Sequence, residues 1–252
     1  DMAVIVVGIE EGEALDRAFL NLPGHQEKMI KAITATEKPV VVVLVGGSAI
    51  IINEWIDKVP AILDVWYPGE EGGNAVADVL FGDYNPAGRL PITFPIHEGQ
   101  LPLYYNHKPT GRIDGYINLT GKPLFPFGYG LSYTNFKYRD IEFSSKEVTT
   151  ADTFEVKFKL TNNGEYAGDE VAQLYIRDLF SSVARPVMEL KGFKRVYLEK
   201  GETKEITFTI SPELLSMLDK DLNRIVEPGE FRIMIGASSN DIRLQKILEL
   251  KE

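Results

Sequence analysis

The chain has 252 residues, of which 44% are hydrophobic and 25% are charged, a composition typical of a folded globular protein and not of a disordered one. Its net charge of −10 argues against nucleic acid as a partner, because phosphate binding depends on a cationic surface. No apolar run reaches the about 20 residues that cross a bilayer, so we expect no membrane partner. Cysteine is absent, which excludes disulfides, thiolate nucleophiles and thiolate metal ligands.

Histidine offers no metal site either. His25, His97 and His107 lie far apart in the sequence and lack the i, i+4 spacing of a zinc-binding helix. We therefore expect neither a metal nor a cofactor.

Residues 1–100 alternate between strand and helix patterns. Apolar runs rich in β-branched residues predict strands at 2–7, 39–45 and 61–67. The first two runs are continuous, which is typical of strands covered on both faces. Apolar residues at helical spacing predict helices within 23–36 and 70–82, the second ending at Gly82 as its C-cap. This order predicts part of an α/β sandwich domain, with a mostly parallel sheet and flanking helices.

The sequence opens inside the first strand pattern, "MAVIVV", with no turn, cap or export signal before it. Three strands are also few for a parallel sheet. We therefore expect the chain to be a piece of a longer protein. The truncated sheet is expected to expose an edge strand, through which the fragment could self-associate.

From about residue 135 the apolar period changes to two, which is typical of half-buried antiparallel strands. About seven short strands with turn clusters between them, and a helical turn at 211–219, predict a β-sandwich. Because no cysteine pair is present, the fibronectin type III-like variant fits better than the immunoglobulin fold. The expected strands lie at 138–143, 153–160, 170–176, 190–198, 204–210, 230–235 and 242–250.

The stretch between the two patterns is rich in Pro, Gly and aromatic residues. So many rings would bury a large apolar area, so we expect this stretch to be pinned across both domains. The predicted organisation is an α/β domain at 1–100, an aromatic and proline-rich linker at 101–134, and a fibronectin III-like β-sandwich at 135–252.

Three carboxylates crowd the loop after the first strand, in "GIEEGEALDR". Loops at the carboxyl ends of parallel strands bind ligands in α/β proteins. Neighbouring carboxylates also raise one another's pKa, which suits a proton donor. From spacing alone, however, solvated loop charges are the better explanation of Glu10, Glu11 and Glu13.

Four sequence blocks, in order, resemble the C-terminal half of family 3 glycoside hydrolases of the β-glucosidase type. They are "YPGEEGGNAVADVLFGDYNPAGRLPITFP", "PLFPFGYGLSY", "LKGFKRVYLEKGE" and "GEFRIMIGASSNDI". The resemblance implies an N-terminal (β/α)8 barrel in the same enzyme, followed by an α/β sandwich domain and a fibronectin III-like domain. It also implies retaining hydrolysis of terminal β-linked glucosyl residues, with oligosaccharides or aryl β-glycosides as substrates. The barrel would supply the nucleophilic aspartate, so this fragment alone is expected to be inactive.

The same resemblance implies a role for Glu13. In many relatives the acid/base glutamate stands three residues before an Asp-Arg pair, in a motif like "EGYDR". Here Glu13 precedes Asp16 and Arg17 at that distance, with Ala14 in place of glycine and Leu15 in place of an aromatic residue. The register therefore implies that Glu13 is the acid/base and leaves Glu10 and Glu11 as solvated charges.

Further residues are weaker candidates for substrate binding. Asp16 and Arg17 could instead form a surface pair that holds the loop. Arg112 and Tyr105, in the polar and aromatic stretch 104–112, could border a sugar site or pack between domains, and the sequence does not decide between these roles.

Two other motifs have structural explanations. Glu70 and Glu71 are rival acids, but they precede a predicted helix, where negative charge complements the helix dipole. We expect Gly72 and Gly73 to form a tight turn.

A second class of function remains open. The chain could be a non-catalytic carbohydrate-binding or scaffolding module, in which the carboxylate at position 13 is incidental. No motif in this chain decides its compartment, and we favour a periplasmic or secreted location over the cytoplasm.

Overall fold

The computed structural model describes residues 2–110 and 115–252. Two compact units emerge, and each is described by itself. The α/β unit comprises residues 1–84, 92–103 and 115–125, and the β-sandwich unit comprises 85–91, 104–114 and 126–252. The proline- and aromatic-rich stretch is thus shared between the two units. In the described part of the chain, no helix combines the length and hydropathy needed to cross a membrane.

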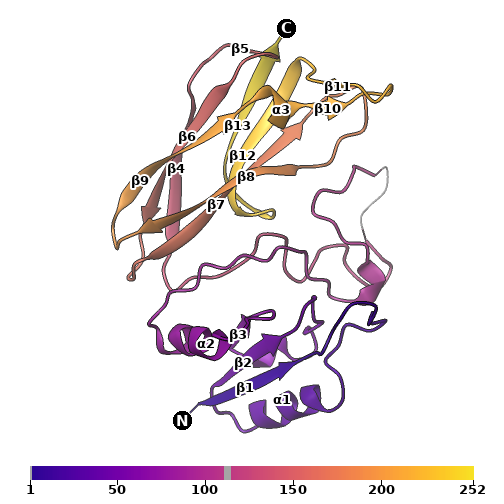
Figure 1. The fold of residues 1–252 in the computed structure, drawn as a ribbon, viewed down its shortest axis with the longest axis vertical. Coiled ribbons are helices and arrows are strands. Elements are labelled where there is room, and N and C mark those ends of the chain that lie inside the picture. The colour runs from indigo at the N-terminus through magenta and orange to yellow at the C-terminus, as the bar shows by residue number, and fades with distance from the viewer. Residues whose placement is uncertain (1, 111–114) are drawn as a thin grey trace. The chain divides into compact units, whose positions relative to one another are not determined.

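Three parallel strands form the sheet of the α/β unit, in the order β1-β2-β3. They are β1 (Ala3–Gly8), β2 (Val40–Val45) and β3 (Ala61–Asp64). Helix α1 (Gln26–Thr34) lies beside β1, and α2 (Gly72–Phe81) follows β3 (Figure 1). Two short 3-10 helices complete the unit, η1 (Ile56–Lys58) and η2 (Glu98–Gln100). Both predicted helices are therefore present, and Gly82 ends α2 in the left-handed conformation that favours glycine.

The core of the α/β unit lies on one face of this sheet. The register places Ile5 beside Val42 and Val7 beside Leu44, and all four are buried together with Ile30 of α1. A fully buried helix residue and a fully buried middle strand are what a parallel sheet under a helix requires.

The prediction that the first strand is covered on both faces is wrong. Val4 and Val6 are 45% and 63% exposed, while Val41 and Val43, their neighbours on β2, are buried. β1 lies at one edge of the sheet and β2 in the middle, and the residues that cover the second face of β2 do not extend over β1. An alternating exposure of apolar residues results.

The prediction that Gly72 and Gly73 form a tight turn is also wrong. Both lie in the first turn of α2, whose N-cap is Glu71. A Cβ at Gly72 would stand 2.5 Å from the ring of Pro68, so this position needs glycine for close packing rather than for a turn. The third strand is shorter than predicted, because the backbone turns away after Asp64 and Trp66 has a φ of 52°.

The β-sandwich unit holds one five-stranded sheet, in the order β5-β13-β12-β7-β8, and one three-stranded sheet, in the order β4-β6-β9. Each of the seven predicted strands corresponds to a strand of these sheets, and the predicted helical turn is α3 (Pro212–Leu215). The strands are β4 (Phe136–Phe143), β5 (Val148–Thr149), β6 (Phe154–Asn162), β7 (Gly168–Asp178), β8 (Glu189–Leu198), β9 (Thr203–Ile210), the paired β10 (Met217–Leu218) and β11 (Arg224–Ile225), β12 (Gly229–Ser238) and β13 (Asp241–Lys251).

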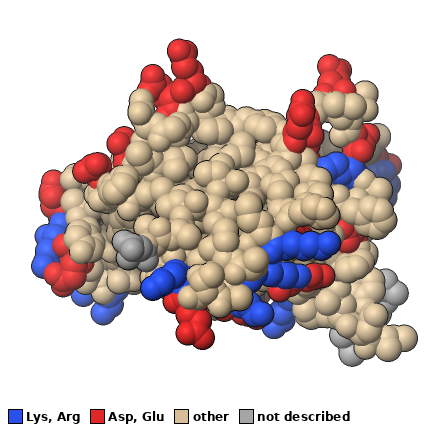
Figure 2. Space-filling model, turned by 90° about the horizontal axis from the view of Figure 1, so that it is seen from below, with Lys and Arg blue, Asp and Glu red and all other residues tan. Residues whose placement is uncertain are grey.

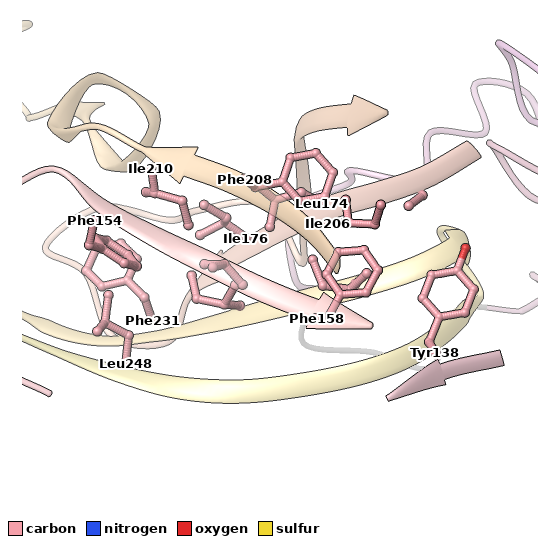
Figure 3. Close-up of a cluster of buried hydrophobic side chains, with 14 of the residues drawn as sticks. Tyr138, Phe154, Phe158, Leu174, Ile176, Ile206, Phe208, Ile210, Phe231 and Leu248 are labelled. Carbon is pink, nitrogen blue, oxygen red and sulfur yellow. The ribbon is translucent and has the colours of Figure 1, made fainter. Parts of the chain in front are cut away.

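Side chains from both sheets fill the interior of this unit. Figure 3 shows Phe154 of β6 beside Phe231 of β12 and Leu248 of β13 at one end of the cluster. Phe158 of β6 lies toward the other end, where its ring stacks on those of Tyr138 and Phe208. The alternation of buried and less buried residues along β6 is the period of two in the sequence. At one end, the Tyr138 hydroxyl donates to Glu170 at 2.8 Å, and Arg89 donates to the same carboxylate at 3.0 Å.

The surface carries both signs of charge. On the face drawn in Figure 2, Lys and Arg side chains stand in small groups beside Asp and Glu rather than in one continuous basic area.

Candidate active site

The loop that follows β1 lies at the carboxyl ends of the three strands, which are together called this edge of the sheet below. Since the strands are parallel, the segments after β1, β2 and β3 all leave from this edge. Backbone hydrogen bonds join them: the N–H of Ile9 donates to the carbonyl of Val45 at 2.9 Å, and that of Gly46 donates to the carbonyl of Trp66 at 3.2 Å. This edge is where open α/β sheets bind ligands.

Glu11 is not a solvated charge, so that prediction is wrong. Its Oε1 accepts hydrogen bonds from Nε of Arg17 at 2.7 Å and from Oγ of Ser48 at 2.5 Å, and its Oε2 accepts from the N–H of Gly47 at 2.7 Å. The side chains of Glu11 and Arg17 are each only 15% exposed. Residues 36 and 37 positions away in the sequence therefore hold this carboxylate.

These contacts fix the ionisation of Glu11. Burial by itself raises its pKa, but the hydrogen bonds from Ser48, Arg17 and Gly47 outweigh burial and hold the pKa below the ordinary value of 4.5. A carboxyl that is ionised throughout the neutral range has no proton to donate. Glu11 is thus a poor general acid.

Glu13 lies in a turn at the exposed tip of the same loop. The N–H of Leu15 donates to the carbonyl of Gly12 at 3.0 Å, which closes a four-residue turn. Ala14 has a φ of 61° at the third position, where type II turns favour glycine. The Glu13 side chain is exposed and has no hydrogen-bond or ion-pair partner among the residues that the structure describes. It is free to meet a ligand.

Arg17 pairs with Glu11 and not with its neighbour Asp16, which is exposed. Besides the carboxylate, its guanidinium donates to Oγ of Ser48 at 2.6 Å and to the carbonyls of Ala49 at 3.3 Å and Phe19 at 3.4 Å. Most of its N–H groups are therefore used within the protein. A role for Asp16 or Arg17 in substrate binding stays a prediction.

Tyr67, which follows β3, completes this edge. Its hydroxyl accepts a hydrogen bond from the N–H of Glu11 and donates one to the carbonyl of Ile9, both at 3.0 Å. A Cβ at Gly47 would lie 2.8 Å from the Tyr67 ring, which explains glycine at that position. Sequence reasoning missed Ser48 and Tyr67. The parallel order of the strands was the signal that their loops would meet.

Asp64, the last residue of β3, is a further carboxyl that the sequence did not single out. Burial raises its pKa from 3.8 to about 6, against a weak opposing hydrogen bond from the N–H of Trp66. Asp64 thus holds a proton more tightly than a solvent-exposed aspartate does.

The remaining candidates lie elsewhere. Tyr105 belongs to the β-sandwich unit, where its ring stacks on Phe127 with centroids 4.3 Å apart and its hydroxyl accepts from the N–H of Leu190 at 3.1 Å. These contacts give Tyr105 a packing role, and a role in sugar binding stays a prediction. Arg112 lies outside the described residues. Among the described residues, no group of three or more His, Cys, Asp and Glu side chains is arranged to hold a metal ion.

Comparison with known proteins shows what the chain resembles. Residues 1–133 match the model of the glycosyl hydrolase family 3 C-terminal domain, and residues 170–239 match a fibronectin type III-like domain. A β-xylosidase of Formosa agariphila is 45% identical over 245 residues, which are 95% of this chain and 34% of that protein. A periplasmic β-glucosidase of Salmonella typhimurium is 40% identical over 96% of this chain and 34% of its own length.

Solved structures agree. The β-glucosidase from Listeria innocua in complex with glucose superposes with a TM-score of 0.94 at 35% identity, over 100% of this chain and 37% of that one. The chain thus spans about a third of the length of the relatives it matches. More than half of its residues match the family model. The chain therefore belongs to glycoside hydrolase family 3, as its C-terminal domain followed by a fibronectin type III-like domain.

Proposed function

We propose that this chain is the C-terminal part of a retaining β-glycosidase, that the enzyme hydrolyses terminal β-linked glucosyl residues, and that Glu13 is its acid/base. Relatives that carry the same C-terminal part include enzymes named β-glucosidases and β-xylosidases. Oligosaccharides or aryl β-glycosides are the proposed substrates. The contacts of Glu11 support the choice of Glu13 most directly, because they remove the nearest rival carboxyl from proton donation.

The proposed reaction has two steps. An aspartate of the N-terminal barrel attacks the anomeric carbon while Glu13 gives its proton to the departing glycosidic oxygen. The Glu13 carboxylate then takes a proton from water, whose oxygen attacks the same carbon and releases the aspartate. Because the nucleophile belongs to other polypeptide, we propose that this chain alone is inactive.

We place that other polypeptide against the uncovered face of β1. Met2, Val4 and Val6 are 54%, 45% and 63% exposed there, and burying such a face is favourable. We also propose that the complete α/β domain has further strands beside β1 and that its sheet is mostly parallel, as it is in this chain. In the isolated chain the same surface would self-associate, which sedimentation would reveal as a concentration-dependent mass.

The test of Glu13 uses the intact enzyme. Glu13→Ala should slow substrates with poor leaving groups by about 10²–10⁴-fold, since these need the proton most, and should slow activated aryl glycosides much less. Added azide should restore turnover, because it attacks the glycosyl-enzyme without needing a base.

Glu10→Gln is the matched control. Glu10 is exposed on the same loop and has no hydrogen-bond or ion-pair partner among the described residues. Its loss should leave the rates for both substrate types unchanged. Equal losses for poor and activated leaving groups in Glu13→Ala would rule out the acid role. Asp64→Asn, tested in parallel, should lack the dependence on the leaving group.

A further inference from the structure

The loop that carries Glu13 is closed at its base by an ion pair. Glu11 and Arg17 stand at either end of a seven-residue stretch, and their side chains meet at 2.7 Å between Oε1 and Nε. Exposed ion pairs contribute little to the free energy of folding, but this pair is mostly buried and its atoms form further hydrogen bonds. The stretch between the two residues is thus a small loop with tied ends.

The tie is anchored to the neighbouring strands. Ser48, after β2, donates to Oε1 of Glu11 at 2.5 Å and accepts from Nη2 of Arg17 at 2.6 Å, so one hydroxyl joins both partners. The N–H of Gly47 donates to the other carboxylate oxygen. The Tyr67 hydroxyl, after β3, accepts from the N–H of Glu11. The base of the loop is therefore fixed to the segments that follow both other strands of the sheet.

We propose that Glu11, Arg17 and Ser48 form a clamp that positions Glu13 for proton transfer, with Glu11 as its central positioning residue. The clamp rests on the proposed acid/base role of Glu13. None of its three side chains has to touch substrate.

Proton transfer needs this kind of support. A general acid acts from about 2.6–3.2 Å, and a misplacement of about 1 Å can cost 10²-fold in rate. Glu13 has no partner of its own among the described residues, so nothing on its own side chain limits its position. The turn at residues 12–15 shapes the backbone of Glu13 locally, and the ends of the loop set where that turn lies relative to the sheet. The clamp supplies that constraint without competing for the proton, since Glu11 is kept ionised.

Three variants of the intact enzyme test the clamp. Glu11→Gln keeps the shape of the side chain and removes its charge. Arg17→Lys keeps the charge and removes the planar guanidinium with its several N–H donors. Ser48→Ala removes only the hydroxyl that bridges Glu11 and Arg17. We expect kcat for substrates with poor leaving groups to fall about tenfold to hundredfold in Glu11→Gln and less in the other two. KM should stay within about twofold, and activated aryl glycosides should lose less.

Azide separates positioning from catalysis. In these variants the Glu13 carboxylate is still present, so azide should not restore turnover, in contrast to Glu13→Ala. Hydrogen–deuterium exchange should be faster in the peptide covering residues 10–19 of Glu11→Gln than in wild type. The matched controls are Glu10→Gln on the same loop and Glu54→Gln, which breaks the exposed ion pair with Lys31; both should match wild type in kinetics and in exchange at 10–19.

The results distinguish two failures. If Glu11→Gln loses activity equally on both substrate types, or changes only KM, or matches Glu10→Gln, while Glu13→Ala behaves as an acid/base variant, the clamp is wrong and the proposed function stands. If Glu13→Ala itself lacks the leaving-group dependence, the proposed function fails. Ser48→Ala keeps the test decisive if Glu11→Gln does not fold, because it deletes a single oxygen.

Discussion

Ala14 occupies a backbone conformation that favours glycine. Its φ of 61° costs a residue with a Cβ about 1–2 kcal/mol, while glycine adopts it freely. The motif that this loop resembles has glycine at this position, and the positive φ is a physical reason to prefer glycine there. Ala14 in place of glycine therefore strains the loop, while Glu13 remains in its turn.

Ala14→Gly should stabilise the α/β unit. We expect the free energy of unfolding to rise by about 0.5–1 kcal/mol, because relief of the strained φ outweighs the entropy that glycine adds to the unfolded chain. Both tryptophans, Trp55 and Trp66, belong to this unit, so their fluorescence during urea unfolding reports on it alone. Ala18→Gly is the control: Ala18 lies in the same loop without a positive φ, and this change should destabilise by a few tenths of a kcal/mol. A stabilising Ala18→Gly would contradict the argument.

Asp64 should make stability depend on pH. Its pKa of about 6 lies above the unfolded value of 3.8, so the folded chain binds the proton more tightly. The stability that this group contributes is complete below about pH 4 and is lost as the pH rises through about 6. Asp64→Asn removes the titration and should be more stable than wild type at pH 7 by about 1–2 kcal/mol, since residual solvation reduces the ~1.4 kcal/mol per pKa unit.

The measurement for Asp64 is the free energy of unfolding of both proteins at several values between pH 4 and 8. The gap between variant and wild type should widen with rising pH. Parallel curves for Asp64→Asn would contradict the assigned shift.

At the scale of elements, the two glycines at the start of α2 have different surroundings. Gly72 is buried with Pro68 only 2.5 Å from where a Cβ would stand, while nothing lies within 4 Å of a Cβ at Gly73. We expect Gly72→Ala to destabilise the unit by about 1–3 kcal/mol through overpacking. Gly73→Ala should stabilise it by about 0.5 kcal/mol through helix propensity. Urea unfolding of the two variants, followed by tryptophan fluorescence, compares them, and equal signs would contradict this assignment.

The sheet edge shows how elements create a site that none of them holds alone. Glu11 comes from the loop after β1, Gly47 and Ser48 from the loop after β2, and Tyr67 from the segment after β3. Parallel pairing brings the three segments to one edge. The proposed clamp is therefore a property of the sheet, and register shifts in β2 would destroy it.

At the scale of the whole molecule, the proposed reaction needs residues that this chain does not contain. It spans about a third of the length of the relatives it matches, and its candidate site holds the proposed acid/base, Glu13, but no described carboxyl that we propose as the nucleophile. Retaining hydrolysis needs two carboxyl groups about 5–5.5 Å apart. The uncovered face of β1 and the exposed Glu13 are both consistent with a surface that other polypeptide completes.

The sequence by itself determined where most of the strands and helices lie and how Glu13 aligns with the motif of the family that the chain resembles. The period of two in residues 153–160 and the continuous apolar run of β2 predict burial from nearest neighbours alone, and both predictions agree with the structure. The spacing of Glu13 to Asp16 and Arg17 needed no tertiary information. Such signals are local, because side-chain direction repeats within a strand or helix.

Only the tertiary structure decided which side chains are in contact and which are exposed. Glu11 looked like its neighbours in the sequence, yet contacts 36 and 37 residues away bury and ionise it, and Arg17 turns to it instead of to Asp16. The exposure of Val4 and Val6 depends on β1 being an edge strand, which its own composition does not encode. The contacts of Glu11 and the exposure of Val4 and Val6 have the same cause. Strand pairing decides which residues from distant parts of the sequence become neighbours, and strand pairing is a property of the folded chain.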